Sequence, residues 1–160
     1  MGWWDAGVFG GDTPLDFLYA IEAAINWDRG KDEMGGLYPV NYLEPEERNK
    51  AKELIEKHWR KVLKLIDAQG HRKSNIEYRY IMTQVIAGVI MATGAKMSKA
   101  FKKKAIEAAQ KDFWANEGDE ERQTRMKELE AAIVKYDGSI VNLENKGLMA
   151  KIAEVLSPED

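Results

Sequence analysis

The sequence predicts an all-α protein: a single compact domain over residues 1–160, with five to six helices and an aromatic, Gly-rich N-terminal segment. Apolar residues recur at three- and four-residue spacing in successive segments, which is the pattern of helices that bury one face. Glycine, proline and capping residues separate these segments. With 160 residues, of which 44% are apolar and 32% charged, the chain can form one hydrophobic core and is too apolar to be disordered.

The first helix is predicted to begin beside Pro14, because Asp12 or Thr13 can cap it and proline is favoured in a first helical turn. Apolar side chains at helical spacing continue this helix to about Asn26. Residues 28–44 contain three glycines and one proline and are predicted to form a long loop. A loop of that length inside a compact domain is often functional.

The second helix is predicted to run without a break from Glu44 to about Ile66. Acidic residues around Pro45 suit the positive end of a helix dipole. An apolar stripe follows at helical spacing, with lysines on the opposite side. The stripe consists of Ala51, Leu54, Ile55, His58, Trp59, Val62, Leu63 and Ile66. The usual explanation for a histidine in such a stripe is a packed, hydrogen-bonded side chain.

The segment from Ile76 to Ala92 is apolar almost all round and closes at Gly94. It is shorter than the usual membrane-spanning helix, and Thr83, Gln84 and Gly88 interrupt it. A helix that is apolar on all sides is normally buried by its neighbours. We therefore expect a central helix, with residues 80–92 the most buried part of the fold.

The helices predicted after Gly94 each combine an apolar stripe with a polar outer face. They cover Ser98–Trp114, with Ser98 as the cap, then Glu120–Tyr136, and finally a C-terminal helix from Glu144 or Asn145 to Leu156. A turn at 116–119 separates the first two, and residues 140–143 are predicted to form a short extended piece.

The N-terminal residues 1–13 are predicted to form an aromatic plug. Trp4 and Phe9 can pack together, because the glycines around them permit tight turns that a side chain would block. Asp12 can then cap the first helix with its carboxylate. Each residue type in this segment therefore has an architectural role.

The chain opens with Met-Gly-x-Trp-x-x-Gly-x-Phe-x-x-Asp and has Asp-Phe-Leu at residues 16–18. This pattern resembles the start of a family of small bacterial and phage proteins described as a domain of unknown function. The resemblance extends more loosely to the helix that ends at Gly94, to the Ala-rich segment 105–109 and to residues 126–136. It implies a similar order of helices, and the family has no established activity to transfer.

Charge is strongly segregated along the chain, although the net charge is only −3. Residues 48–111 contain sixteen basic and five acidic side chains, whereas residues 1–47 contain two and ten and residues 112–160 contain six and twelve. Such a division either draws the acidic ends onto the basic middle or displays opposite potentials to charged partners. The lysines of the middle form two groups, which are Lys50, Lys57, Lys61 and Lys64, and then Lys96, Lys99, Lys102, Lys103 and Lys104.

The chain lacks the residues that several kinds of functional site require. Cysteine is absent, which excludes disulfides, thiolate zinc sites and a cysteine nucleophile. Neither of the two histidines, His58 and His71, has a serine or aspartate at a recognisable nucleophile spacing. No Gly-rich phosphate-binding motif is present, so we expect no cofactor. The N-terminus lacks a basic-then-apolar segment, which favours a cytoplasmic location over secretion.

Four N-terminal carboxylates suggest a metal or acid–base site, since oxygen ligands suit Mg²⁺ or Mn²⁺. These carboxylates are Asp5, Asp12, Asp16 and Glu22. Their spacing matches no calcium loop, and the chain has no Glu-x-x-His pair for a di-metal centre. A metal-dependent hydrolase is therefore the third hypothesis for the function.

The leading expectation is a non-enzymatic interaction protein that binds, and inhibits or neutralises, a macromolecular partner, with a protein favoured as the partner and no membrane association. Size, charge segregation and the family resemblance suit a phage-encoded inhibitor of a host system or an immunity-type protein. The alternative is a nucleic-acid-associated protein that uses residues 48–111. Against it, lysine outnumbers arginine in the basic stripes, no aromatic residues interleave with them, and the flanks are acidic.

Candidate partner-binding residues lie in the two lysine groups and in the 28–44 loop. They are Lys57, Lys61, Lys64, Lys99, Lys102, Lys103, Tyr38 and Tyr42.

Overall fold

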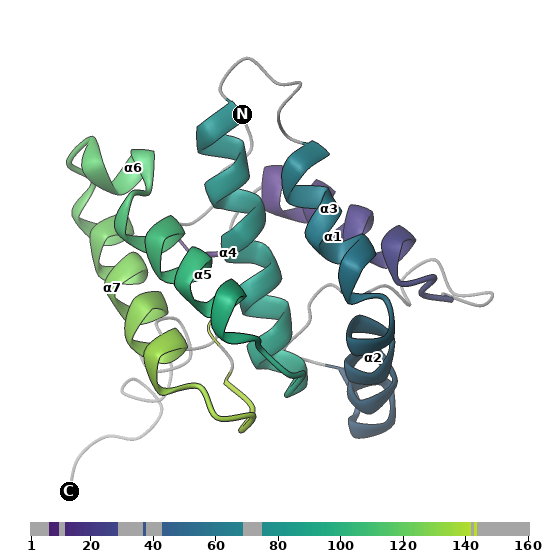
Figure 1. Cartoon of the computed structure of the whole chain (residues 1–160). Coiled ribbons are helices and arrows are strands. Elements are labelled where there is room, and N and C mark those ends of the chain that lie inside the picture. Colours follow the sequence, from purple (N-terminus) through teal and green to yellow (C-terminus); the bar gives the residue numbers. More distant parts are fainter. Residues whose placement is uncertain are drawn as a thin grey trace, which may run out of the picture.

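The structure is a computed structural model that describes residues 7–9, 12–28, 37, 43–68, 75–141 and 143. These residues form helices and connecting segments without any strand, which confirms the all-α class (Figure 1). The helices are α1 (Asp12–Ala24), α2 (Pro45–Lys57), α3 (Trp59–Ala68), α4 (Asn75–Thr93), α5 (Lys99–Gln110), α6 (Phe113–Asn116) and α7 (Glu120–Lys135).

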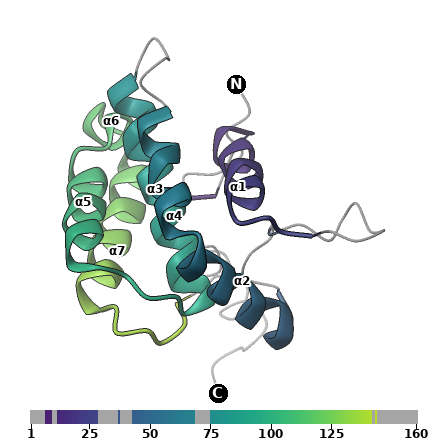
Figure 2. The same cartoon turned by 45° about the vertical axis from the view of Figure 1, so that its right-hand side comes forward.

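Helix α4 is the centre of the fold, as its apolar sequence predicts. Every residue from 81 to 93 is buried, and α4 contacts α1, α2, α3 and α5. Helix α1 lies on one side of α4, and the pair α5 and α7 lies on the other (Figure 2). Most helices therefore bury their apolar stripes against α4, directly or through α5.

The two threonines buried in α4 satisfy their hydroxyl groups within the helix. Thr83 donates to the carbonyl of Arg79 at 2.7 Å, and Thr93 donates to that of Val89 at 2.8 Å. The helix ends at Gly94, whose φ of 79° is readily adopted only by glycine among the common residues. In the described part of the chain, no helix has both the length and the apolar content needed to cross a membrane.

Side-chain caps set the limits of α5, α6 and α7. Ser98 accepts a hydrogen bond from the N–H of Phe101, which confirms the predicted start of α5. The prediction that this helix continues through Trp114 is wrong, because α5 stops at Gln110. Asp112 instead caps the start of α6, because its carboxylate accepts a hydrogen bond of 2.9 Å from the N–H of Ala115. Helix α7 covers almost the range predicted for it.

The predicted second helix is two helices, α2 and α3, which meet at His58. His58 has φ −104° and ψ 24°, outside the helical values, although its N–H still bonds to Leu54 at 2.9 Å. The buried residues Ala51 and Ile55 of α2 and Val62 and Ile66 of α3 keep one helical spacing across the break. The apolar pattern therefore gives no sign of it, and neither glycine nor proline marks the position.

Of the predicted N-terminal plug, the structure describes residues 7–9. Val8 and Phe9 are buried with 6% and 2% of their surface exposed. A Cβ added to Gly88 of α4 would lie 2.6 Å from Cζ of Phe9, so the glycine leaves the space that the ring occupies. Trp4 and the side chain of Asp12 lie outside the described part of the structure.

Two further predictions also lie mostly outside the described residues: the 28–44 loop, apart from Leu37 and the residues at its ends, and the C-terminal helix. Leu37 is fully buried in the core. Of the piece predicted to be extended at 140–143, Val141 donates its N–H to the carbonyl of Met91 at 2.8 Å. This bond holds the chain after α7 against the end of α4.

The contact between Phe9 and Gly88 predicts a non-additive pair of substitutions. Phe9→Ala should lower the free energy of unfolding by about 3–5 kcal/mol, as loss of a large buried aromatic side chain does. Gly88→Ala should destabilise the wild type through the clash. In the Phe9→Ala background it should stabilise by up to about 1 kcal/mol, the usual helix advantage of alanine over glycine. Urea unfolding of the four proteins measures both effects, and an equal effect of Gly88→Ala in both backgrounds would contradict the contact.

Candidate interaction site

The two groups of predicted lysines lie on neighbouring helices. Lys61 and Lys64 are exposed on α3, and Lys99 and Lys103 are exposed on α5. The indole of Trp59, in the first turn of α3, packs edge-on against the ring of Phe101, in the first turn of α5, with centroids 5.1 Å apart. In Figure 1 the two helices lie on either side of α4. We call the exposed cations of these two helices the basic surface, which consists of Arg60, Lys61, Lys64, Lys99, Lys103 and Lys104.

The other candidate residues have different positions. Lys57 is exposed at the end of α2, next to the basic surface. Lys102 is half-buried and donates from Nζ to the carbonyl of Tyr136 at 3.3 Å, so it ties α5 to the end of α7. Tyr38 and Tyr42 lie outside the described residues. The structure therefore brings together four of the eight candidates, with a fifth alongside.

Acidic side chains near the basic surface are already engaged. Asp67 lies 3.5 Å from Nη2 of Arg79, and Glu107 lies 3.4 Å from Nζ of Lys111. The carboxylate of Glu56 accepts the backbone N–H of Lys96 at 2.9 Å. Exposed pairs of this kind contribute little to stability. A carboxylate that is already paired, however, competes less with a binding partner for the lysines of the basic surface.

A groove opens beside the basic surface, with α4 as its floor and α3 and α5 as its walls. It has a volume of about 190 Å³. Its lining consists of Ile66, Arg79, Tyr80, Thr83, Lys104 and Glu107. Tyr80 packs at its edge against Phe113, with ring centroids 6.1 Å apart. Sequence reasoning missed this association of aromatic and basic side chains, because the residues come from three segments of the chain.

A second polar centre lies on the other side of α4, around the guanidinium of Arg122. Arg122 is 1% exposed and forms a two-point ion pair with Asp112, with Nε 3.0 Å from Oδ1 and Nη2 2.8 Å from Oδ2. The same Nη2 donates to Oε1 of Gln84 at 2.8 Å, and Nη1 donates to the carbonyl of Gly7 at 3.1 Å. One side chain of α7 thus holds α4, the α5–α6 junction and the N-terminal segment.

The electrostatics of this centre favour the ion pair. Burial alone would raise the pKa of Asp112, but the hydrogen bonds and charge of Arg122, with further bonds from Gln84 and Ala115, hold that pKa below its usual value. Arg122 also lies over the indole of Trp114, 4.8 Å from its centroid. The indole N–H in turn donates to Asp119 at 2.9 Å.

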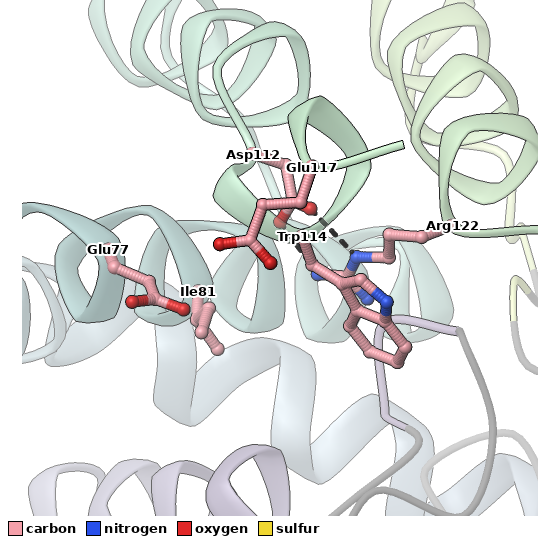
Figure 3. A pocket seen from close by; sticks show the side chains of 6 residues that line it. All are labelled: Glu77, Ile81, Asp112, Trp114, Glu117 and Arg122. Carbon is pink, nitrogen blue, oxygen red and sulfur yellow. Dashed lines mark hydrogen bonds and ion pairs between the residues drawn. The ribbon is translucent and has the colours of Figure 1, made fainter. Parts of the chain in front are cut away.

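A pocket of about 230 Å³ opens in front of this network (Figure 3). The carboxylates of Glu77 and Glu117 point into it, above Ile81 and the Trp114 ring. Burial raises the pKa of Glu77, and the negative charges of Glu117 and Asp112 raise it further. Crowded carboxylates of this kind repel anions, so this pocket and the basic surface have opposite charge preferences.

The N-terminal carboxylates proposed as metal ligands do not converge in the described structure. Asp16 is exposed on α1, whereas Glu22 is buried, so the two lie on different faces of one helix. Within the residues that the structure describes, no group of three or more histidine, aspartate and glutamate side chains is placed to hold a metal ion. Asp5 lies outside those residues.

Comparison of the chain with protein-family models, with curated proteins and with solved structures finds no match. The resemblance of the N-terminal residues to a family of small bacterial and phage proteins therefore stays a prediction.

The raised pKa of Glu77 predicts a pH-dependent effect of Glu77→Gln. Because the folded state binds this proton more tightly than the unfolded state, ionisation at neutral pH costs folding free energy. Glu77→Gln should therefore raise the free energy of unfolding at neutral pH. The gain should shrink as the pH falls below the ordinary glutamate value of 4.5, where the wild-type carboxyl is also neutral.

Urea unfolding at several pH values measures this difference, with Glu53→Gln on the exposed face of α2 as the matched control. The control should show no comparable gain at neutral pH. A loss of stability in Glu77→Gln at neutral pH would show that the carboxylate has a stabilising partner and would contradict the prediction.

Proposed function

We propose that this protein is a non-enzymatic interaction protein that binds an acidic protein partner through its basic surface. The observation that supports this best is the tertiary placement of the lysines. Lys61 and Lys64 are separated from Lys99 and Lys103 by more than thirty residues of sequence, yet the Trp59–Phe101 contact joins the starts of their two helices. Clustered exposed cations attract a partner of opposite charge and increase its rate of association.

A protein is favoured over a nucleic acid as the partner for two reasons. The basic surface consists of five lysines and one arginine and includes no aromatic residue on which bases could stack. The acidic side chains Asp67 and Glu107 also lie beside the basic side chains and would repel a continuous phosphate backbone. A folded protein with a local acidic patch avoids both difficulties.

A non-catalytic role is favoured because the most buried charged groups have structural partners. Asp112 and Arg122 neutralise each other and join four segments of the chain. Binding without chemistry suits a protein that inhibits or neutralises its partner in the cytoplasm, as a phage inhibitor of a host system or an immunity-type protein would.

Charge reversal on α3 tests this function. Lys61→Glu with Lys64→Glu should abolish capture of the partner from a lysate of the source organism, read by quantitative mass spectrometry. The two side chains are exposed, so the free energy of unfolding should change by no more than about 1 kcal/mol. Lys57 is left unchanged, because it lies on α2 and does not belong to the basic surface.

The matched control is Lys127→Glu with Lys135→Glu on α7, which changes the net charge equally and alters two exposed lysines of another helix. This control should capture the partner as the wild type does. Mobility-shift assays with DNA and RNA should show no specific complex even at low salt. Tight, salt-dependent binding of either nucleic acid would instead support the alternative, a nucleic-acid-associated protein.

A further inference from the structure

An apolar strip leads into the groove between α3 and α5. Ile76 and Tyr80 are four residues apart on α4 and therefore lie on the same face of that helix, and Thr83 follows at the next turn. Ile76 is 51% exposed, and Phe113, which packs on Tyr80, is 40% exposed. Exposed large apolar residues that adjoin a groove are typical of a protein-interaction site.

The uncharged part of the groove lining has few free polar groups. Ile66 is a core side chain that is 6% exposed, and the hydroxyl of Thr83 is used within α4 on the carbonyl of Arg79. The volume of about 190 Å³ is below the range of roughly 300–1,000 Å³ that small-molecule sites occupy. A single apolar side chain is the kind of group that such a space accepts.

Two of the three charged residues that line the groove are cations, and the carboxylate of the third, Glu107, lies 3.4 Å from Nζ of Lys111. Arg79 lies at one side, and its side chain is 45% exposed even though it pairs with Asp67. Lys104 lies on the α5 wall, is exposed, and has no hydrogen-bond or ion-pair partner among the described residues. Lys103 and Lys99 continue the positive charge along the same helix. An apolar floor between cationic rims complements an apolar side chain flanked by carboxylates.

We infer that this groove binds an acidic peptide segment of the partner protein. One apolar side chain of the segment occupies the space above Ile66, Tyr80 and Thr83, and carboxylates beside it pair with Arg79 and Lys104. This inference rests on the proposed function, to which it adds the chemistry of the segment that is recognised. The contact resembles other peptide grooves in physical terms: a buried anchor supplies affinity, and charges on the rim supply specificity and rate.

A single-stranded nucleic acid is the competing occupant, since Tyr80 and Phe113 are aromatic. Their rings already pack against each other edge-on, with an interplanar angle of 62°. A base stacked on either ring would have to share the space with the other ring. This packing favours the peptide.

The test is selection of short random peptides displayed on phage against the immobilised full-length protein at physiological salt. The enriched peptides should be acidic and share one central aromatic or aliphatic residue. Synthetic copies, measured by fluorescence anisotropy, should lose roughly tenfold in affinity when that residue is replaced by alanine. An oligothymidine of similar length, used as the nucleic-acid probe, should bind more weakly than the selected peptides.

Two protein variants locate the site. Lys104→Glu should weaken the selected peptides by roughly tenfold or more, because it replaces an attractive charge at the rim by a repulsive one. Lys127→Glu on α7 makes the same change at another exposed lysine and should leave the affinity unchanged. Circular dichroism melting of both variants should match the wild type, since both positions are exposed.

Several results would overturn the inference. These are enrichment of no peptides or of basic ones, equal weakening by Lys104→Glu and Lys127→Glu, and tighter binding of oligothymidine. The proposed function fails separately. If Lys61→Glu with Lys64→Glu abolishes capture of the partner while Lys104→Glu does not, the basic surface binds the partner but the groove is wrong. If neither change affects capture, the proposed function itself is contradicted.

Discussion

The fold depends most on one buried interaction, the two-point ion pair between Arg122 and Asp112. Taking a guanidinium and a carboxylate out of water is costly, and this cost is offset only when geometry and additional hydrogen bonds are good. Here the side chain of Gln84 and the carbonyl of Gly7 accept further hydrogen bonds from the Arg122 guanidinium, and the N–H of Ala115 donates one to Asp112. The pair therefore sets the relative positions of α4, the α5–α6 junction, α7 and the N-terminal segment together.

The position of α5 links this buried pair to the surface proposed for binding. Asp112 follows Lys111, the C-cap of α5, and caps α6. Gln84 of α4 donates both to Asp112 and to the carbonyl of Ala108, which ties the end of α5 to α4. Phe101 of α5 then holds Trp59 of α3 at a defined distance. The groove lies where α3, α4 and α5 meet, at the turn of α4 that carries Tyr80. Interior and surface thus have separate roles: buried polar groups fix the helices, and exposed lysines supply the charge.

Much of the fold follows from local sequence patterns. The apolar run of α4, the Ser98 cap of α5 and the range of α7 are all confirmed, because periodicity and capping act over a few residues. The break at His58 is missed because the apolar spacing continues through it. The end of α5 has a signal in Asp112, since aspartate is a favoured helix cap, but the prediction followed only the apolar stripe over the same residues.

The long-range features have no local signal. Periodicity places Gln84 inside a buried helix and Arg122 on an amphipathic one, but it does not pair them across 38 residues. In the sequence, Gly88 is only an interruption in an apolar run. The structure shows its role, because the ring of Phe9 packs against it. The lysine groups are visible in the sequence, whereas their neighbour Tyr80 and the groove between them arise only when three helices pack. The candidate site was therefore predictable in its charge and not in its shape.

A double-mutant cycle between Asp112 and Arg122 tests the central claim most directly. Asp112→Asn keeps a residue that can cap α6 while removing the charge, and Arg122→Met keeps much of the volume of the side chain. Each single change should lower the free energy of unfolding by about 3–5 kcal/mol, because it leaves the other group buried without its main partner. The double variant should lose less than the sum, by about 1–3 kcal/mol, in urea unfolding. Strictly additive losses would contradict the account, since they would mean that the two side chains stabilise the fold independently.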